Sequence, residues 1–322
     1  MTASTLHGPD VEAAALALGE RARRDEPLAP LTTYRVGGAA ALFVDATNHD
    51  DLRAVAAARR ASGLPVLVVG RGSNLLVADH GFRGIAVSIA GLADWIDIGD
   101  EGTDGSVVVA AGGAVALPVL ARRTAAAAVT GFEWAVGVPG SVGGAVKMNA
   151  GGHGSDIAAS LIDATIASLG GDDRDDIVER RPASSVGLRF RGSDLRDDEV
   201  VLDVRLALWR GDRDASERQI AEIVRWRREH QPGGQNCGSV FVNPVPGEVS
   251  AGALIDGLGL RGLRMGTAWV SEKHANFIQA SEGGTAADVR AVIEAVRQRV
   301  ADATGYHLHS EVRLVGFADD VS

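Results

Sequence analysis

The sequence has almost no cysteine and contains no long hydrophobic run. Cys237 is the only cysteine among 322 residues, so no disulfide can form within the chain, as is typical of proteins in a reducing compartment. No run of about 18 apolar residues occurs, and residues 1–10 lack the basic and then apolar pattern of a secretory signal. We therefore expect a cytoplasmic protein without membrane-spanning helices.

Aromatic residues and net positive charge are also scarce. Only 4% of the residues are aromatic, whereas 46% are apolar and 41 are glycine, so we expect a core of Ala, Val and Leu with many close backbone approaches. The formal net charge of −10 disfavours binding to nucleic-acid phosphates or to an anionic membrane surface. Neither kind of partner is expected, and no metal site is predicted.

The spacing of apolar residues predicts alternating helices and strands along most of the chain. We expect a helix over residues 11–24, a βαβ unit over 42–69, and a domain boundary near 211–213. The charged segment 171–181 is predicted to be a solvated hairpin tip. The other expected helices cover 117–129, 215–230, 250–258 and 285–301, the last with Thr285 as N-cap, and the other expected strands cover 85–89, 107–111, 200–208, 267–278 and 310–315.

A first glycine-containing loop follows the strand expected at residues 65–69. It reads Gly70-Arg71-Gly72-Ser73-Asn74-Leu75-Leu76. Glycines let a backbone and its N–H groups approach a phosphate closely, so the loop is a candidate phosphate site, with a plain β-turn as the alternative. It lacks the third glycine and the following helix of a dinucleotide-binding Rossmann motif.

A second loop, over residues 137–154, holds seven glycines among its 18 residues. That density is too high for a stable helix or strand interior, which favours a loop that wraps a ligand. The alternative is a flexible linker, but linkers are rich in serine and charge, whereas this segment contains Val138, Val142, Val146 and Met148. We therefore expect the segment to be buried against a ligand.

Gly238-Ser239 lies between an apolar stretch and a proline turn, and the lone acid Glu311 lies near the end of the chain. A small residue pair lets the backbone and a hydroxyl approach a ligand closely. Gly-Ser pairs are also common in ordinary turns, so this pair indicates a ligand site only together with the other motifs.

Five sequence blocks together resemble one family, the UDP-N-acetylenolpyruvoylglucosamine reductases, which are flavoenzymes of peptidoglycan precursor synthesis. The resemblance extends from about residue 31 to residue 316. Its carriers are residues 32–38 (TTYRVGG), 70–77 (GRGSNLLV), 131–134 (GFEW) with the glycine loop that follows, 236–241 (NCGSVF) and 271–277 (SEKHANF). Any one block is weak, but five in this order are specific.

The resemblance implies an α+β fold: a two-subdomain FAD-binding domain of the vanillyl-alcohol-oxidase type and a C-terminal α+β substrate domain. Periodicity alone would not separate this fold from a doubly wound sheet. The implied limits are residues 1–30 for an N-terminal helix and lead-in, 31–212 for the FAD domain and 213–322 for the substrate domain. We expect a monomer.

The resemblance also implies FAD and NADPH as cofactors and a UDP-sugar as substrate. The first loop would hold the FAD pyrophosphate, with Gly72 allowing the close approach, and the glycine loop would line the flavin. The implied cofactor residues are Tyr34, Gly70, Arg71, Gly72, Ser73, Asn74, Leu75, Gly137, Pro139, Gly140, Ser141, Gly143, Gly144, Asn149, Ala150 and Gly151.

In this family the vinyl ether of an enolpyruvyl group is reduced, with a hydride added to one alkene carbon and a proton to the other. The matching positions are Ser239 as proton donor, Arg191 against the substrate carboxylate, and Glu311 beside them. A positioned cation and acid are what this chemistry needs. Taken without the resemblance, Arg191 reads as a surface arginine and Glu311 as an exposed strand residue.

Three positions depart from the family pattern. Phe190 stands where the family usually has tyrosine, and Val242 where it often has lysine, leaving Lys147 or Lys273 as candidate replacements. Cys237 takes a position commonly occupied by alanine, and we expect it to be an inert small hydrophobe. The short interval from Arg191 to Ser239 resembles the subclass that lacks a substrate-capping insertion.

Two other functions remain open from the sequence. One is a flavin-dependent alcohol or sugar oxidase of the same fold, although His80 and His153 lie in no motif that we can match to a covalent flavin. The other is a nucleotide-binding protein without catalysis, against which Arg191, Ser239 and Glu311 count.

Overall fold

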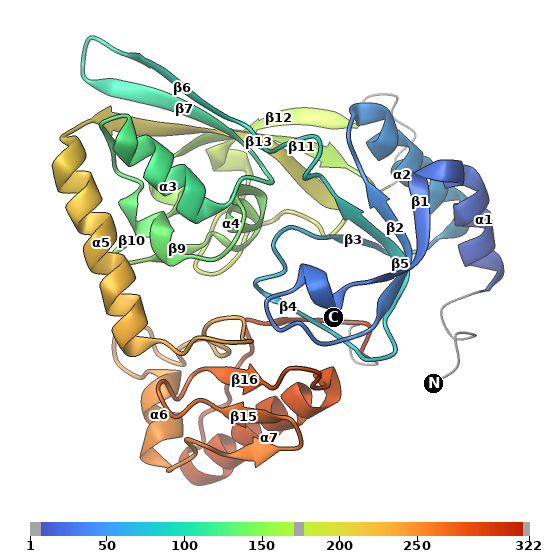
Figure 1. Cartoon of the computed structure of the whole chain (residues 1–322), viewed down its shortest axis with the longest axis vertical. Helices are drawn as coiled ribbons and strands as arrows, with labels where there is room; N and C mark the ends of the chain where they lie inside the picture. Colours follow the sequence, from blue (N-terminus) through green and yellow to red (C-terminus); the bar gives the residue numbers. More distant parts are fainter. Residues whose placement is uncertain (1–7, 171–176, 318–322) are drawn as a thin grey trace.

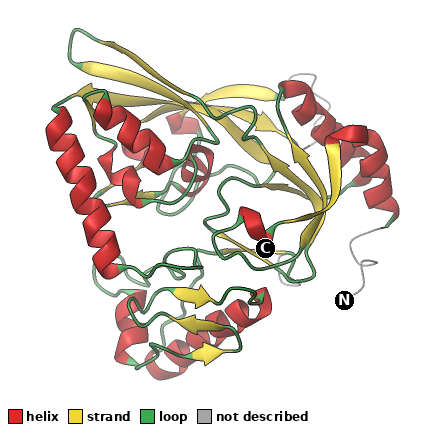
Figure 2. Ribbon diagram, viewed as in Figure 1, coloured by secondary structure: helices red, strands yellow, loops and turns green. Residues whose placement is uncertain are grey.

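The computed structural model describes residues 8–170 and 177–317, and its chain forms three packed parts (Figure 1). Two of them are built on separate β-sheets, and the third is a small C-terminal α+β unit. Figure 2 shows two helices on the outer side of the first sheet, and the helices of the second part along one face of the larger sheet. Loops run between the three parts.

The first part is a four-stranded sheet in the order β1-β2-β5-β3, made of β1 (Ala22–Pro27), β2 (Ala39–Asp45), β5 (Phe82–Ser88) and β3 (Val66–Val68). Helices α1 (Pro9–Leu18) and α2 (His49–Ser62) pack beside it. Asn48 caps α2 by accepting from the Asp51 N–H, and Gly63 ends it in the left-handed conformation. The βαβ unit expected over 42–69 is confirmed by β2, α2 and β3.

The second part is a larger sheet in the order β12-β11-β13-β7-β6, with β8 also paired to β13. Its central strand, β13 (Glu199–Arg210), pairs antiparallel with both β11 (Leu161–Ser168) and β7 (Ser106–Gly112). The other strands are β6 (Ile96–Glu101), β8 (Val129–Thr130) and β12 (Val178–Pro182). Helices α3 (Leu117–Ala126), α4 (Val142–Met148) and α5 (Arg213–His230) enclose its apolar core, and β9 (Gly151–Gly152) and β10 (Ser155–Asp156) form a small hairpin.

The third part packs α6 (Ala251–Gly257) and α7 (Ala286–Thr304) against β14 (Arg264–Met265), β15 (Ala268–Val270) and β16 (Ile278–Ala280). Thr285 caps α7, as predicted, by accepting from the Asp288 N–H. The Asp79 carboxylate, from the first part, accepts from the first two N–H groups of α7, those of Ala286 and Ala287, at 2.8 and 2.9 Å. A carboxylate at a helix N-terminus is favourable, so this contact docks the third part on the first.

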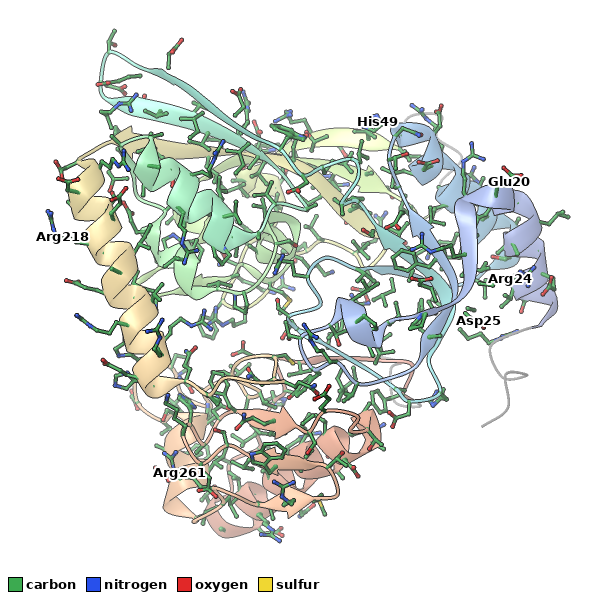
Figure 3. The ribbon with its side chains drawn as sticks, viewed as in Figure 1. Glu20, Arg24, Asp25, His49, Arg218 and Arg261 are labelled. Atoms are coloured by element: carbon green, nitrogen blue, oxygen red, sulfur yellow. The ribbon has the colours of Figure 1, made fainter. Side chains whose placement is uncertain are left out.

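The chain then returns to the first part. Strand β17 (Arg313–Val315) pairs in parallel with β4 (Leu75–Val77), directly after the first glycine loop. Figure 3 shows that the labelled charged side chains, among them Glu20, Arg24, Arg218 and Arg261, lie on the outer surface, as their charge requires. No helix within 8–170 and 177–317 is long and apolar enough to cross a membrane.

Two expected elements were wrong. The N-terminal helix ends at Leu18 rather than near residue 24, because Gly19 has a φ of +58°, and Ala22–Pro27 form a strand paired with β2. The glycine loop contains helix α4, since its glycines allow the helix to pack tightly on the sheet. A Cβ on Gly143 would lie 3.1 Å from the Gly113 carbonyl oxygen and 3.3 Å from that of Val201. Tertiary packing here overrides helix propensity.

Two further expectations need adjustment. Residues 178–181, expected in a hairpin tip, belong to strand β12, whereas residues 171–176 lie outside the described residues. Helix α5, assigned to the substrate domain by a boundary at 213, buries Ile220 and Ile223 in the core of the second part. By packing, α5 therefore belongs with the second part rather than with the C-terminal unit.

Glu133 provides a buried polar link between α5 and the second part. Its carboxylate accepts from the Ser216 and Thr130 hydroxyls and the Gly131 N–H. Burial alone would raise the pKa of Glu133. The hydrogen bonds, of which that from Ser216 has the largest effect, lower the pKa by more than burial raises it, so the folded pKa lies below the ordinary value. A lowered pKa contributes stability that is present above the unfolded pKa and is lost as pH falls through the folded pKa.

We predict that Glu133→Gln lowers the free energy of unfolding by about 1–3 kcal/mol at pH 7, because the amide cannot accept from all three donors. The difference should shrink as the pH falls below about 4.3, where the unfolded carboxyl takes up a proton. Urea unfolding at both pH values measures it. The control Glu294→Gln, at an exposed position of α7, should lower the free energy of unfolding by less than about 0.5 kcal/mol. A pH-independent Glu133→Gln effect would contradict the linkage.

Candidate active site

A cavity of about 780 Å³ lies between the first and second parts. Its walls come from both parts and from the two segments that follow α5 and α7. The lining residues are Pro30, Leu31, Thr32, Thr33, Arg35, Val68, Val69, Gly70, Arg71, Ser88, Ile89, Ala90, Asp94, Gly113, Ala114, Ala116, Val119, Ser141, Gly143, Gly144, Lys147, Arg196, Asp197, Glu199, Val200, Val201, Gly234 and Arg313. Pockets of this size accept cofactors and drug-sized ligands. The junction is thus large enough for a substantial part of a dinucleotide.

Five of the predicted cofactor residues line this cavity: Gly70, Arg71, Ser141, Gly143 and Gly144. The two glycine-containing loops face each other across it, since a Cβ on Gly70 would lie only 2.6 Å from the Ser141 hydroxyl oxygen. Among the described residues, no protein acceptor receives a hydrogen bond from the main-chain N–H groups of 70–74. Free N–H donors beside a glycine fit a pyrophosphate.

Gly72 has a different role from the predicted one. Its φ is +56°, and a Cβ there would lie 2.1 Å from the Leu31 carbonyl oxygen. The residue is buried and does not line the cavity. Glycine is required at this position by its close packing against the main chain of Leu31 and by its positive φ.

Tyr34 is not brought to the cavity either. Its side chain is fully buried in the core of the C-terminal part, beside Cys237, and burial raises the pKa of its hydroxyl well above the ordinary value. Its neighbours Thr32, Thr33 and Arg35 line the cavity instead. The block predicted to contact the cofactor therefore reaches the cavity through these three residues and not through Tyr34.

The remaining predicted cofactor residues do not line the cavity. Ser73 faces Gly140 across the two loops, Leu75 begins β4, and Gly137 lies against His153. Asn149 ends α4 in a left-handed conformation, and its amide donates to the Arg189 carbonyl oxygen at 3.2 Å. Pro139 and Ala150 also lie outside the cavity lining.

Two of the three predicted catalytic residues, Arg191 and Glu311, come into contact from distant segments, and none of the three lines the cavity. Arg191 Nε lies 3.3 Å from Glu311 Oε2, and Arg191 Nη1 donates to the Gly151 carbonyl oxygen at 3.2 Å. The Glu311 N–H donates to the Val240 carbonyl oxygen at 2.7 Å, next to Ser239. The alternative interpretation, in which Arg191 and Glu311 are exposed surface residues, does not fit, since their side chains are only 31% and 17% exposed.

The backbone and the charges at this cluster are unusual. Arg191 has a φ of +56°, a region that costs energy for a residue with a side chain and that occurs often at functional sites. Burial raises the pKa of Glu311, and Arg191 opposes this only in part. A carboxyl with a raised pKa keeps its proton to higher pH, as a proton-transferring group needs.

The positions that depart from the family pattern are now placed. Phe190 is 64% exposed, with its ring centre 5.3 Å from the Arg191 guanidinium carbon. Lys147 lines the cavity, whereas Lys273 donates to the main chain of Arg228 on α5. Burial raises the pKa of the Cys237 thiol strongly, which keeps it protonated and unreactive.

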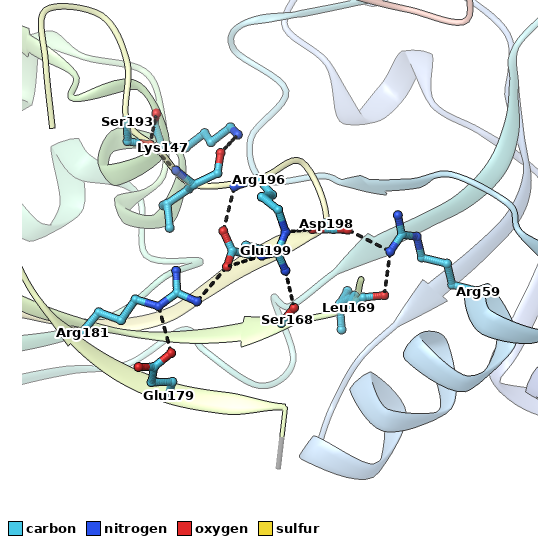
Figure 4. Close-up of polar contacts among 11 residues, drawn as sticks. Arg59, Lys147, Ser168, Leu169, Glu179, Arg181, Ser193, Arg196, Asp198 and Glu199 are labelled. Carbon is cyan, nitrogen blue, oxygen red and sulfur yellow. Dashed lines mark hydrogen bonds and ion pairs between the residues drawn. The ribbon is translucent and has the colours of Figure 1, made fainter. Parts of the chain in front are cut away.

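Sequence reasoning missed a charged network beside the cavity (Figure 4). Arg196 and the buried Glu199 line the cavity, and Glu199 accepts from Arg181 at 2.8 Å. Asp198 joins Arg196 to Arg59 of α2, at 3.1 and 2.8 Å, so that the network ties the first part to the second. The available signal in the sequence was the high density of charged residues over 194–199.

Asp197 joins two further cavity cations. It lies 3.1 Å from Lys147 Nζ and 2.9 Å from Arg313 Nη2, which come from the second part and from the returning strand β17. All three residues line the cavity.

Known proteins match nearly the whole chain. An FAD binding domain family matches residues 40–169, and the C-terminal domain family of UDP-N-acetylenolpyruvoylglucosamine reductase matches residues 230–315. The reductase of Heliobacterium modesticaldum is 42% identical over 91% of this chain and 90% of its own length, and that of Chloroflexus aggregans is 40% identical over 91% and 97%.

A solved structure agrees with these matches. The UDP-N-acetylenolpyruvylglucosamine reductase of Thermus caldophilus superposes with a TM-score of 0.74 at 31% identity, over 92% of this chain and 99% of its own. The fold is the predicted one, a two-subdomain FAD-binding domain of the vanillyl-alcohol-oxidase type with a C-terminal α+β domain. The chain belongs to the UDP-N-acetylenolpyruvoylglucosamine reductase family.

Proposed function

We propose that this chain reduces the enolpyruvyl group of UDP-N-acetylglucosamine enolpyruvate to the lactyl ether, giving UDP-N-acetylmuramate for peptidoglycan. The observation that carries the proposal is the Arg191–Glu311 ion pair, in which the Glu311 N–H is bonded to the carbonyl of Val240, the residue after Ser239. FAD, reduced by NADPH, supplies the hydride for this reaction when bound.

The cavity residues would hold the dinucleotide. Gly70 and Ser141 leave a narrow gap between two loops, and the free N–H groups of 70–74 suit the pyrophosphate. Arg71 and Lys147 add positive charge to the same wall. We propose that residues 31–212 form the FAD domain, with α5 packed on it, and that the remainder supplies Ser239 and Glu311.

Arg191 would bind the substrate carboxylate and stabilise the charge that builds on it as the hydride arrives at the neighbouring alkene carbon. Its Nε is buried without a well-aligned hydrogen-bond acceptor, although Glu311 lies at ion-pair distance. The guanidinium therefore retains donor capacity for a carboxylate, and its planar fork suits two oxygens at once.

Ser239 would give its hydroxyl proton to the carbon next to the carboxylate. Serine is a weak acid, so its proton must be replaced by a neighbour in the same step. Glu311 suits that role because burial raises its pKa and its N–H is bonded to the carbonyl of Val240, the residue after Ser239. The two residues together form a short proton relay in this proposal.

The oxidase alternative is not favoured. The C-terminal reductase domain matches over residues 230–315, and the relatives named as reductases cover about nine-tenths of the chain. His153, which could have tethered a flavin, instead packs edge-on against Trp226 at 5.3 Å.

We also propose a monomer in a reducing compartment. One chain supplies the cavity and all three catalytic candidates, and its only cysteine is buried and free. Light scattering of the purified protein tests the first point.

We predict that Gly70→Val weakens FAD binding about tenfold or more, because the added side chain would enter the gap toward Ser141. Fluorescence titration of the FAD-free protein measures the affinity. Gly233→Val, where a Cβ meets nothing within 4 Å, is the matched control and should bind normally. Gly72→Val should instead lower stability, since it strikes the main chain of Leu31. Normal affinity in Gly70→Val would remove the pyrophosphate assignment.

We predict that Arg191→Lys slows the half-reaction with the enolpyruvyl substrate roughly 100-fold, because lysine keeps the charge but loses the planar fork. Reduction by NADPH should change far less, as anaerobic stopped-flow of each half-reaction would show. Arg189→Lys, two residues away and paired with exposed Asp194, is the control. Equal damage to both half-reactions would sink the assignment of Arg191.

We predict that Ser239→Ala slows the same half-reaction by about 10²–10⁴-fold while leaving FAD binding intact. Glu311→Gln should slow it too. Because the protonated carboxyl is the active form, the wild-type rate should fall as pH rises through the raised pKa of Glu311, and Glu311→Gln should lack that fall. Cys237→Ala should change little. The reverse pattern, with the thiol essential and Ser239 dispensable, would show the donor to be Cys237.

A further inference from the structure

We propose that Asn74 is a positioning residue that couples the cofactor loop to Glu311, so that a dinucleotide bound at the loop fixes the place of the acid. The inference rests on the reductase function proposed above. It assigns to Asn74 a role other than direct contact with the cofactor through its side chain.

Asn74 grips the segment of Glu311 at two points. Its side-chain Nδ2 donates to the Glu311 carbonyl oxygen at 2.8 Å, between residues 237 positions apart in sequence. Its own carbonyl oxygen accepts from the Arg313 N–H at 3.0 Å. Only the amide nitrogen can face a carbonyl oxygen productively, so the orientation of the Asn74 amide is determined by its partner.

Glu311 is held from its other side as well. Its N–H donates to the Val240 carbonyl oxygen at 2.7 Å, and Ser239 precedes Val240 in the chain. The main chain of Glu311 is thereby bonded to the cofactor loop through its carbonyl oxygen and to the segment of Ser239 and Val240 through its N–H. Loss of the Asn74 contact would free one of the two ties and leave a part-buried carbonyl without that donor.

The loop itself divides its groups between two tasks. Gly70 and Arg71 line the cavity, whereas Asn74 does not, and the main-chain N–H groups of 70–74 have no acceptor within the described residues. The main chain is available to a pyrophosphate while the side chain of Asn74 serves Glu311. Ordering the loop by a ligand would therefore also order residues 311–313.

The test is hydrogen exchange measured by mass spectrometry on FAD-free protein, with and without added FAD. In the wild type, FAD should slow exchange about tenfold or more in peptides covering 70–76 and also in those covering 309–315. In Asn74→Ala the first protection should remain and the second should vanish, with FAD affinity changed less than about threefold. Asn74→Asp, which keeps the size but loses the N–H donor, should behave alike.

A second readout separates positioning from a general loss of stability. With Glu311 freed and more hydrated, its pKa should fall toward the ordinary value, so the alkaline fall in the substrate half-reaction should begin at a lower pH in both Asn74 variants than in the wild type. Asn243→Ala is the control: it loses a comparable contact, to the Ala251 N–H, but leaves Asn74 intact. It should keep both the FAD-dependent protection and the pH profile.

The outcomes are distinguishable. If FAD protects 70–76 but not 309–315 in the wild type, or if Asn74→Ala retains protection of both, the coupling is overturned. The wild-type measurement alone decides this if neither variant folds. Failure of the wild type to bind FAD at all would instead contradict the proposed function.

Discussion

The parallel pairing of β17 with β4 is the constraint on which the site depends. It joins Arg313–Val315 to Leu75–Val77, so the end of the chain is held against the strand that follows the first glycine loop. Glu311 lies two residues before β17 and reaches Arg191 of the second part only because of this pairing. The Asp79 carboxylate at the N-terminus of α7 supports the same docking.

Charge is distributed at the junction so that the protein supplies its own counter-ions. Asp197 lies between Lys147 and Arg313, and the side chain of Glu199, 1% exposed, holds Arg181 and the Arg196 main chain. Buried charges are tolerated when they are paired in this way. Arg191 is paired with Glu311 too, but its buried Nε has no well-aligned acceptor and its backbone has a positive φ, which supports the proposal that it binds a substrate anion.

Much of the fold could be predicted from local signals, because capped amphipathic helices are encoded by their own residues. Thr285 and the apolar spacing of α7 are an example. Helix α4 was missed because its stability comes from packing Gly143 on the Gly113 and Val201 carbonyls, which no local pattern encodes. Strand β1 was missed because its partner, β2, decides its structure.

The sequence predicted which segments contribute to the candidate site, but not which way their side chains point. The resemblance located the Arg191, Ser239 and Glu311 segments, which the fold brings together. A motif does not say which way a side chain points, so Tyr34 and Gly72 were assigned to the cofactor although one fills a core and the other meets the main chain of Leu31. Asp197 and Glu199 were missed because their partners lie far away in sequence.

The central claim is that one cavity and one acid cluster together reduce an enolpyruvyl ether. The most direct measurement is an anaerobic titration of the purified flavoprotein, followed at the flavin absorbance near ~450 nm. NADPH should bleach this band, and the enolpyruvyl sugar nucleotide should restore it with formation of the lactyl ether in equal amount. A bleached protein that recovers its colour with oxygen, but not with the enolpyruvyl nucleotide, would contradict the account.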